Sequence, residues 1–519
     1  MKLEALLARF LSVPAHVRGA AVEVHSISDD SRTVTPGTLF VARTGTTSDG
    51  RAFVADAVTR GAVAVLHVGE DPCADLPAAA NVVRVRMPDG TDLVRFSGLL
   101  AERLEGNPSE WLRMVGITGT NGKTTMAFLI KQFVVEAGSP CGVIGTVVID
   151  DGAVAEPANL TTPGAIETAR ALGRMVRNGC SACAMEVSSH ALDQGRADAL
   201  RFRTAVFSNL TGDHLDYHGT MQAYAAAKAR LFRMLSADGT AVVNADDPWH
   251  ATMVADCAGR VLRCSVGTDA QPPQAVECTA TVHASRLGWQ DTTFTGPWGS
   301  VRVKLPIVGR HNAMNALEAA AAAWSIGVPA EAISRALAAC KAPPGRLEPV
   351  TTPDDPFAVL VDYAHTDDAL LNVLTALRPL VGPGGRLVTV FGCGGDRDRT
   401  KRPRMMKVAC AHSDRVIVTS DNPRTEDPEA IIDEVFTGRP QGQGSAPAAT
   451  PEVVRQVDRA RAIAQAVTEA RAGDIVLIAG KGHEDYQIIG TVKRPFNDRH
   501  EALAALGRAM SSRSATLLA

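Results

Sequence analysis

The stretch Gly116-Ile-Thr-Gly-Thr-Asn-Gly-Lys-Thr-Thr125 decides the fold of the middle of the chain. An apolar run at residues 112–117 leads into it, and apolar residues at helical spacing follow it as far as Gly138, so it joins a predicted strand to a predicted helix. In this context the glycines let backbone N–H groups close on phosphate oxygens, Lys123 can reach the terminal phosphates and Thr124 can ligate Mg²⁺. The strict phosphate-loop pattern has a glycine where this chain has Ile117, so we interpret the loop as a variant.

Alternating strands and helices continue on both sides of this loop. The chain has 519 residues, and a single core rarely exceeds roughly 250 to 300 residues, so we expect three domains. The turn-forming segments Asn107-Pro-Ser109 and Pro343-Pro-Gly345 mark two domain boundaries. They divide the chain into residues 1–108, 109–343 and 344–519. The predicted class is α/β, with a small first domain, a central P-loop mononucleotide-binding domain with a mostly parallel sheet, and a Rossmann-like C-terminal domain.

The expected elements follow from apolar runs between turn signals. We expect a helix over 53–60 in the first domain, an antiparallel insertion at 267–300 and an Ala-rich helix at 315–324 in the second, and a surface loop at 441–450 in the third. The remaining expected strands lie at residues 38–42, 62–68, 181–187, 204–210, 241–244, 358–363, 386–391, 415–419 and 474–478.

Charged residues and glycines follow three of the third-domain strands, at residues 394–397, 421–424 and 480–484. Ligands of doubly wound sheets sit at the carboxyl ends of the strands. We therefore expect these segments to form one edge that can hold a small zwitterion.

Three more residues of the middle domain are candidates for chemistry. Glu186 ends a predicted strand, His214 lies in a ligand-rich segment after the next strand, and Lys228 lies on a predicted helix. Taken alone, His214 would be a structural histidine and Lys228 a solvated lysine. Beside a phosphate loop, His214 becomes a candidate metal ligand together with Glu186.

The net charge and the distribution of apolar residues indicate which classes of partner to expect. The 53 basic and 56 acidic residues give a net charge of −3, which favours neither nucleic acid nor an anionic membrane as a partner. No stretch approaches the ~18 apolar residues of a membrane span, and the ten cysteines are sparse. Cys180 and Cys183 have metal or redox spacing, but we favour buried thiols because no second pair lies nearby. These features predict a cytoplasmic enzyme.

Seven motifs, in this order, resemble those of the Mur ligases across nearly the whole chain. They are residues 119–125, 213–219, 309–315, 344–348, 362–366, 391–398 and 479–487. Within the family they are most similar to the enzymes that add the third residue of the peptidoglycan stem peptide. The chain departs from the usual pattern at Gly212, Asp367 and His500, none of which is a ligand position.

The resemblance implies a role for each matching residue. It implies ATP binding by Gly119, Thr120, Asn121, Gly122, Lys123, Thr124, Thr125, Asn312 and Asp362. It implies binding of UDP-N-acetylmuramoyl-dipeptide by Ser31, Thr46, Thr47, Ser48, Thr161, Thr162, Ser188, Gln194 and Arg196. It implies Mg²⁺ ligation by Thr124, Glu186, His214 and Lys228, the last as a carbamate, and catalysis by Lys123, Glu186, His214 and Lys228. It implies binding of the incoming amino acid by Arg397, Asp421, Asn422, Pro423, Arg424, Gly480 and Glu484.

The implied reaction has two steps and needs no protein nucleophile. The γ-phosphoryl group of ATP moves to the D-glutamate carboxylate of UDP-N-acetylmuramoyl-L-alanyl-D-glutamate, and an amine then displaces phosphate from the acyl phosphate. Asp421-Asn-Pro-Arg424 is the form of its motif associated with meso-diaminopimelate. A guanidinium can pair with the distal carboxylate that lysine lacks, so the expected amine is diaminopimelate. Mg²⁺, ATP and these small substrates are the expected partners of a monomer.

Two other functions stay open on the sequence. A noncatalytic P-loop binding protein would be expected to have lost Lys123, Glu186, His214 or Lys228, and all four are present. A related amide ligase, for folylpolyglutamate or for muramoyl-alanine, is disfavoured by Asp421-Asn-Pro-Arg424 and by Asp30-Ser-Arg32.

Overall fold

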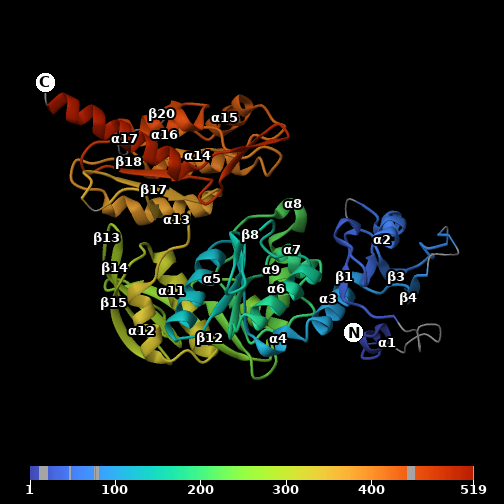
Figure 1. The fold of residues 1–519 in the computed structure, drawn as a ribbon. Coiled ribbons are helices and arrows are strands. Elements are labelled where there is room, and N and C mark those ends of the chain that lie inside the picture. The colour runs from blue at the N-terminus through green and yellow to red at the C-terminus, as the bar shows by residue number, and fades with distance from the viewer. Residues whose placement is uncertain are drawn as a thin grey trace.

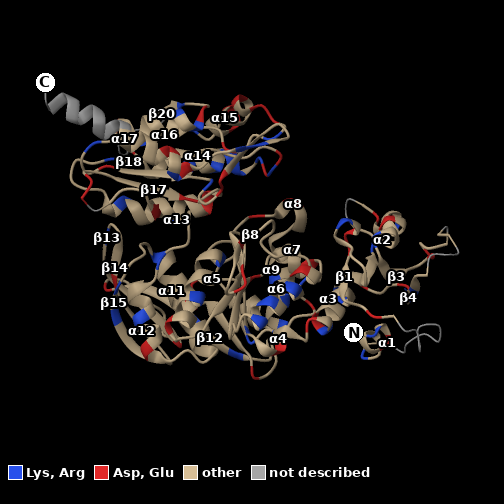
Figure 2. Ribbon diagram, in the orientation of Figure 1, with Lys and Arg blue, Asp and Glu red and all other residues tan. Residues whose placement is uncertain are grey.

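The computed structural model describes residues 1–10, 22–45, 48–74, 76–77, 81–352, 354–440 and 451–517. These residues form three α/β domains arranged along the chain, which confirms the expected fold class (Figure 1). Acidic and basic residues are interspersed over all three (Figure 2). The expected loop at 441–450 and the candidates Thr46 and Thr47 lie outside the described residues. None of the helices in the described ranges is both long and apolar enough to cross a bilayer.

The first domain is a four-stranded parallel sheet with strand order β1-β2-β3-β4. Its elements are α1 (Leu3–Leu7), β1 (Ser26–Ser28), the 3-10 turns η1 (Ser31–Thr33) and η2 (Gly50–Phe53), β2 (Thr38–Ala42), α2 (Val54–Thr59), β3 (Ala62–Val68), β4 (Val83–Met87) and α3 (Leu93–Leu104). The side chains of β2 alternate between two apolar clusters, with Leu39 and Val41 facing α3 and Phe40 and Ala42 facing α2. Strands 38–42 and 62–68 are confirmed. The helix expected over 53–60 is preceded by η2, which Asp49 caps.

The central domain is built on an eleven-stranded sheet with strand order β15-β14-β13-β12-β11-β10-β5-β9-β6-β7-β8. The strands are β5 (Arg113–Thr118), β6 (Cys141–Ile144), β7 (Val148–Asp150), β8 (Ala155–Pro157), β9 (Ala182–Glu186), β10 (Thr204–Phe207), β11 (Thr240–Asn244), β12 (Arg260–Thr268), β13 (Cys278–Arg286), β14 (Trp289–Gly296) and β15 (Gly299–Leu305). The middle of the sheet is parallel, and both ends are antiparallel. The expected insertion therefore continues this sheet, with β13 parallel to β12 and antiparallel to β14.

Helices cover both faces of the central sheet. They are α4 (Pro108–Trp111), α5 (Lys123–Glu136), α6 (Ala165–Arg177), α7 (Ser189–Asp193), α8 (Leu215–His218), α9 (Met221–Arg233), α10 (His250–Val254), α11 (Arg310–Ser325) and α12 (Ala330–Ala339). One core packs α5, α11 and α12 on the sheet, and a second packs α6, α7, α9 and α10 on the other face. Cys180 and Cys183 are buried free thiols in the second core, as expected.

The third domain is a six-stranded sheet with order β16-β17-β21-β18-β19-β20, parallel except for β16. Its elements are β16 (Glu348–Pro349), β17 (Ala358–Asp362), α13 (Asp367–Leu377), the 3-10 turn η3 (Arg378–Leu380), β18 (Leu387–Phe391), α14 (Lys401–His412), β19 (Arg415–Val418), α15 (Pro428–Phe436), β20 (Glu452–Arg455), α16 (Arg459–Thr468), β21 (Ile475–Ala479), β22 (Tyr486–Ile489), β23 (Val492–Pro495) and α17 (Asp498–Leu517). Helices α13, α14 and α15 pack on one face, and α16 and α17 pack on the other. This is the expected doubly wound arrangement.

Candidate active site

The loop between β5 and α5 can be built only with glycine at two positions. Gly119 has φ 147°, and a Cβ there would lie 1.9 Å from Ser208 Oγ. Gly122 has φ 87°, and a Cβ there would lie 2.4 Å from Asn315 Oδ1. Both angles are in the region that side chains disfavour. The loop is therefore wedged between the end of β10 and helix α11, with its amides at the start of α5.

Two lysines meet at one carbonyl of this loop. Lys123 Nζ donates to the carbonyl oxygens of Gly119 and Thr120, at 2.8 Å each. Lys228 Nζ, from α9, donates to the same Gly119 oxygen at 2.8 Å, and Lys228 is only 1% exposed. Burial lowers the pKa of Lys123 and lowers that of Lys228 well below its ordinary value. Lys228 is therefore a buried side chain behind the loop, which excludes the solvated alternative.

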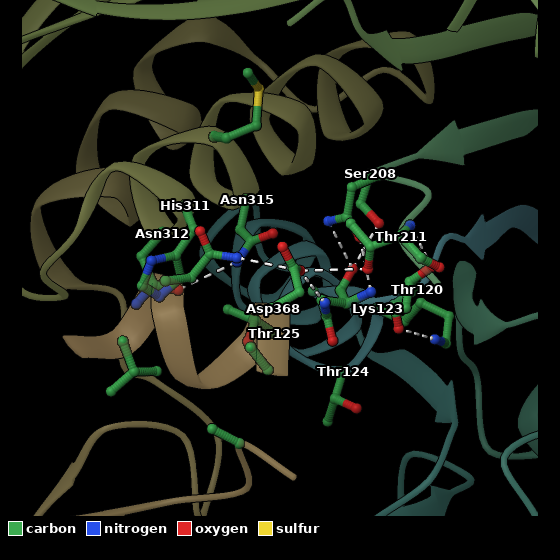
Figure 3. A pocket seen from close by; sticks show the side chains of 18 of the residues that line it. Thr120, Lys123, Thr124, Thr125, Ser208, Thr211, His311, Asn312, Asn315 and Asp368 are labelled. Carbon is green, nitrogen blue, oxygen red and sulfur yellow. Dashed lines mark hydrogen bonds between the residues drawn. The ribbon is translucent and has the colours of Figure 1, made fainter. Parts of the chain in front are cut away.

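A cavity of about 770 Å³ opens between the central and third domains. Figure 3 shows Lys123, Thr124 and Thr125 on one side of it, and His311, Asn312 and Asn315 of α11 on another. The candidates that line it are Thr120, Asn121, Gly122, Lys123, Thr124, Thr125, Thr161, Glu186, His214, Asn312 and Asp362. The structure thus brings most of the expected ATP and metal candidates together, while Lys228 lies behind the wall.

Glu186 links this cavity to four of the candidates for the dipeptide substrate. Its carboxylate accepts hydrogen bonds from Thr146 N (2.9 Å) and Thr146 Oγ1 (3.1 Å), and Thr146 Oγ1 is 3.0 Å from Thr161 Oγ1. Thr162 Oγ1 donates to the Glu186 carbonyl at 2.9 Å and accepts from Ser188 N at 3.0 Å. Arg196 Nη1 donates to the Thr162 carbonyl.

His214 sits at the edge of the cavity in a strained backbone conformation. Its φ is 54°, it caps α8, and its Nε2 lies 3.5 Å from Asp213 Oδ2. Burial lowers the pKa of His214, which favours the neutral imidazole that a metal requires. Its ring also packs edge-on against His190, with the ring centres 4.9 Å apart. Gln194 lies nearby, exposed, with Nε2 3.4 Å from Tyr217 Oη.

Asp362 anchors the first segment of the third domain, which directly follows the central domain. Its carboxylate accepts from Leu347 N at 2.7 Å and from Ala364 N at 2.8 Å. Leu347 has φ 44°, which is unusual for a residue other than glycine. Burial raises the pKa of Asp362. Asn312, on the opposite wall, donates to the Val308 carbonyl at 2.8 Å and accepts from Asn315 at 3.2 Å.

The donor set at this cavity fits Mg²⁺ better than a transition metal. The described residues contain no cluster of three or more His, Cys, Asp or Glu side chains placed to enclose an ion. Thr124, Glu186 and His214 nevertheless line one cavity beside the phosphate loop. Mg²⁺ is usually bound through one or two protein groups together with water and substrate phosphates. An open, oxygen-rich site of this kind meets that requirement.

The third-domain candidates form a second cluster outside this cavity. Asn422 Nδ2 donates to Glu484 Oε2 at 2.9 Å. Lys481 is fully buried, and its ammonium lies 3.0 Å from Glu484 Oε2, 3.1 Å from Asn422 Oδ1 and 3.4 Å from Asp421 Oδ1. Burial raises the pKa of Asp421, but Lys481, Arg459, His365 and Lys401 together lower it more, so the net shift is downward. A Cβ on Gly480 would lie 2.8 Å from Asp421 Oδ2.

Arg424 joins two of the three strand-end loops. Its Nη1 donates to the Gly395 carbonyl at 2.7 Å, and its backbone, with φ 53°, pairs with the β22–β23 hairpin through Ile488 O and Gly490 N. The Pro423 carbonyl lies close against Gly395. A Cβ added to Gly395 would be 1.9 Å from the Pro423 carbonyl oxygen. Arg397 is exposed and donates only to the Asp396 carbonyl among the described residues. Its guanidinium is thus available for a ligand.

The first domain has a cavity of its own, of about 540 Å³. Ser31 and Ser48 line it, together with Arg32 and Arg43. Ser31 and Ser48, two of the four first-domain candidates, therefore line the same cavity. The other two candidates, Thr46 and Thr47, lie outside the described residues.

Three residues at these sites were not predicted as functional. Arg346 stacks on Tyr363, with its guanidinium 4.4 Å from the ring centre, and donates to Thr124 Oγ1 at 3.3 Å. Asp368 accepts from Asn121, and Lys481 centres the third-domain cluster. Arg346 and Lys481 lie inside motifs that the sequence does reveal. Their contacts join segments far apart in the chain, which spacing alone does not show.

Comparison with known domains gives three matches in the same order as the three structural domains. Residues 23–94 match the Mur ligase family catalytic domain, residues 117–323 match the Mur ligase middle domain, and residues 345–482 match the Mur ligase glutamate ligase domain.

Full-length relatives carry one common name. The UDP-N-acetylmuramoyl-L-alanyl-D-glutamate–2,6-diaminopimelate ligase of Synechococcus elongatus is 43% identical over 520 residues, covering 99% of this chain and 100% of that protein. The ligase of the same name from Gloeobacter violaceus is 44% identical over 492 residues, covering 94% and 95%. A solved structure of a ligase of that name has a TM-score of 0.68 at 33% identity, covering 98% of this chain and 99% of that one.

A MurF ligase from Thermotoga maritima, solved with ADP, shares the fold at a TM-score of 0.61 and 16% identity, covering 94% of this chain and 98% of that one.

Proposed function

The chain belongs to the Mur ligase family, and from this premise we propose that it is the ATP-dependent ligase that joins meso-2,6-diaminopimelate to UDP-N-acetylmuramoyl-L-alanyl-D-glutamate. The relatives named for this reaction match this chain over nearly its whole length. The observation that carries the choice of amine is the third-domain cluster. Its Glu484 carboxylate accepts from Asn422, and Arg424, two residues further along that loop, reaches the Gly395 carbonyl of the next loop. Such a site offers a charge partner to both kinds of end group of an amino acid.

ATP would occupy the large cavity with its phosphates on the loop. We assign the phosphates to the amides of Gly119 to Thr125 and to the ammonium of Lys123, and the nucleoside to the wall that contains Asn312, with Asp362 nearby. Within the described part of the chain, Lys123 bonds only to loop carbonyls, so it can turn to the γ-phosphoryl group without breaking an ion pair there. Its charge offsets the charge that gathers as phosphate meets carboxylate.

Mg²⁺, when bound, would neutralise and align the phosphate oxygens. We propose Thr124, Glu186 and His214 as its protein partners. Glu186 already has two donors on its carboxylate from Thr146. These bonds hold the carboxylate in place at the cavity wall.

We propose that Lys228 acts as a carbamate. Its amine is buried and donates to the Gly119 carbonyl, and burial makes an ammonium without a counter-ion costly. Attack of the neutral amine on carbon dioxide, with loss of one proton from the nitrogen, would form a carboxylate-like group at the back of the phosphate loop, which is a hard ligand suited to Mg²⁺.

The dipeptide substrate would span the first and central domains. We assign its uridine end to the cavity containing Ser31 and Ser48, together with Thr46 and Thr47. Thr161, Thr162, Ser188, Gln194 and Arg196 would hold the dipeptide end, because Thr162 connects the backbone of Glu186 to Ser188 and Arg196. The D-glutamate carboxylate would then lie beside the γ-phosphoryl group.

The incoming amine would bind at the third-domain cluster. Arg424 would pair with the distal carboxylate of diaminopimelate, Glu484 with an ammonium, and Arg397 with a second carboxylate, while Asn422 and Gly480 shape the pocket. We take the domains to be residues 1–108, 109–343 and 344–519. Because ATP and a UDP-linked precursor are its substrates, we place the reaction in cytoplasmic peptidoglycan precursor synthesis, carried out by a monomer.

The test is turnover of purified protein with ATP, Mg²⁺ and UDP-N-acetylmuramoyl-L-alanyl-D-glutamate, with meso-diaminopimelate or L-lysine as the amine. Phosphate release and product mass are followed in parallel. Product with diaminopimelate and little with lysine is expected. Equal turnover with lysine would contradict the role of Arg424, and no turnover with either amine would contradict the proposed reaction.

A further inference from the structure

Two fully buried side chains of opposite charge lie directly behind the third-domain cluster. Arg459 Nε and Nη2 donate to Asp498 Oδ1 and Oδ2, at 2.7 Å each, and both side chains are 0% exposed. Arg459 is the first residue of α16 and Asp498 the first residue of α17. The pair therefore fixes the starts of two neighbouring helices with a planar, two-bond contact.

The same guanidinium also reaches the ends of two strands. Arg459 Nη2 donates to the Ala479 carbonyl at 2.9 Å, and Nη1 approaches the Ser420 carbonyl at 3.5 Å. Ala479 precedes Gly480, and Ser420 precedes Asp421. Strands β21 and β19 are not neighbours, since β18 lies between them. One side chain thus sets the positions of two loops that the sheet itself does not join.

The spacing between these loops is tight at this point. A Cβ on Gly480 would lie 2.8 Å from Asp421 Oδ2 and 3.8 Å from Arg459 Nη2. Any shift of the guanidinium would therefore change where Asp421 stands relative to Gly480. Arg459 is also one of the cations that keep the Asp421 carboxyl ionised.

Stability alone is a weak reason for such a pair. A buried ion pair contributes little more than two well-packed apolar side chains would, because removing both charges from water is costly. Apolar side chains could not form the directed hydrogen bonds that join Arg459 to Asp498 and to the Ala479 and Ser420 carbonyls.

We propose that Arg459 and Asp498 are a positioning pair for the amino-acid pocket: they set the distance between the Asp421 loop and the Gly480 loop and so determine the affinity for the incoming amino acid. Neither residue touches the substrate. The identity of that substrate rests on the function proposed above, whereas the positioning of the loops does not.

The test compares variants at the two ends of the same sheet. Arg459→Lys keeps the charge and loses the planar fork, and Asp498→Asn keeps the shape and loses the charge. Arg386→Lys is the matched control, because Arg386 forms a similar ion pair with Asp474 (2.8 Å) at the amino ends of β18 and β21. Each protein is examined by amide hydrogen exchange and by initial rates.

With Arg459→Lys, faster exchange is expected at residues 420–424 and 479–484, together with a rise of about tenfold in the apparent KM for diaminopimelate and less than about twofold in that for ATP. Arg386→Lys should leave both quantities near those of the unaltered protein. If Arg459→Lys does not fold, Asp498→Asn carries the same expectation.

Unchanged exchange and KM in the Arg459 and Asp498 variants, or equal changes in Arg386→Lys, would overturn the proposal. If the unaltered protein does not use diaminopimelate, the proposed function fails, and the exchange data still decide whether the pair positions the loops.

Discussion

The side-chain amide of Asn121, in the phosphate loop, donates a 2.8 Å hydrogen bond to the carboxylate of Asp368, in the first turn of α13. The same carboxylate oxygen is 3.3 Å from Thr211 Oγ1. The third domain therefore contacts the nucleotide loop directly through this carboxylate, and Figure 3 shows Asp368 beside Thr211.

Replacing Asp368 by alanine should weaken the use of ATP, because the loop loses the hydrogen bond between Asn121 and the third domain. One net hydrogen bond is worth about 1 kcal/mol, so kcat/KM for ATP should fall by about fivefold. Initial rates at varied ATP measure this. Asp367→Ala is the control, since Asp367 pairs with Arg404 within the third domain at 3.0 Å; equal losses in the two variants would contradict the contact's role.

Replacing Arg424 by alanine should affect the amino acid far more than the nucleotide. Loss of one charged partner of a carboxylate costs about 3 kcal/mol, so the apparent KM for diaminopimelate should rise by about a hundredfold, with that for ATP nearly constant. Steady-state rates with each substrate varied in turn provide the measurement. Arg399→Ala, which removes an exposed arginine paired with Glu434, should change neither value. A parallel rise in both KM values for Arg424→Ala would show that the residue has another role.

Replacing Lys228 by alanine should abolish most activity, because the phosphate loop loses both a tether and the proposed anionic ligand. Added acetate or another short carboxylate should restore part of the rate by occupying the vacated space. Intact-protein mass before and after exposure to bicarbonate would show the addition of carbon dioxide to the unaltered chain. Lys131→Ala, on α5 and paired with Asp150, is the control and should remain active. Absence of any rescue would count against the carbamate.

The stability of the link between the first and central domains should depend on pH through Glu102. Glu102 is 4% exposed, accepts from Ser109 Oγ at 2.6 Å, and its Oε1 has no hydrogen-bond partner among the described residues. Burial raises the pKa of Glu102 to about 7 from an ordinary 4.5. The folded state therefore binds the proton more tightly than the unfolded state, and stability falls as pH rises from about 4.5 to about 7.

Glu102→Gln should remove this dependence. The variant should match the unaltered protein near pH 4.5 and exceed it by about 3 kcal/mol in free energy of unfolding at pH 8, because the shift of the pKa is worth ~1.4 kcal/mol per unit. Urea unfolding at both pH values measures the difference. Glu110→Gln, at an exposed residue, should show no such gain. A gain of equal size at both pH values would mean that burial of the charge is not the cause.

The elements that the sequence predicted well have strong local signals. The strand Thr38–Ala42 alternates between two buried faces, and the loop from Gly119 to Thr125 combines glycines with a lysine at a strand–helix junction. Both patterns are formed by residues that are adjacent in the sequence, so they can be recognised without the structure. In contrast, β8 has only exposed residues and β20 has no buried residue, so neither has a strong apolar pattern to reveal it.

The candidate site was predicted less completely than the fold, because several of its contacts join residues that are far apart in the sequence. Lys481 is a glycine-flanked lysine in the sequence, which does not show that its ammonium is buried against Asp421 and Glu484. Arg459 and Asp498 lie 39 positions apart and carry no local signal of pairing. Lys228 was identified through resemblance, while its burial behind Gly119 is visible only in three dimensions.

The two loop glycines also restrict the order in which mutations can accumulate. A side chain at Gly119 would collide with Ser208, and one at Gly122 would collide with Asn315. A change at Ser208 or Asn315 would relieve the collision but would leave the positive φ of the glycine, so no single earlier change opens either position to a side chain. Drift at Gly119, Gly122, Ser208 and Asn315 is thus coupled, and the four positions should be inherited as a unit.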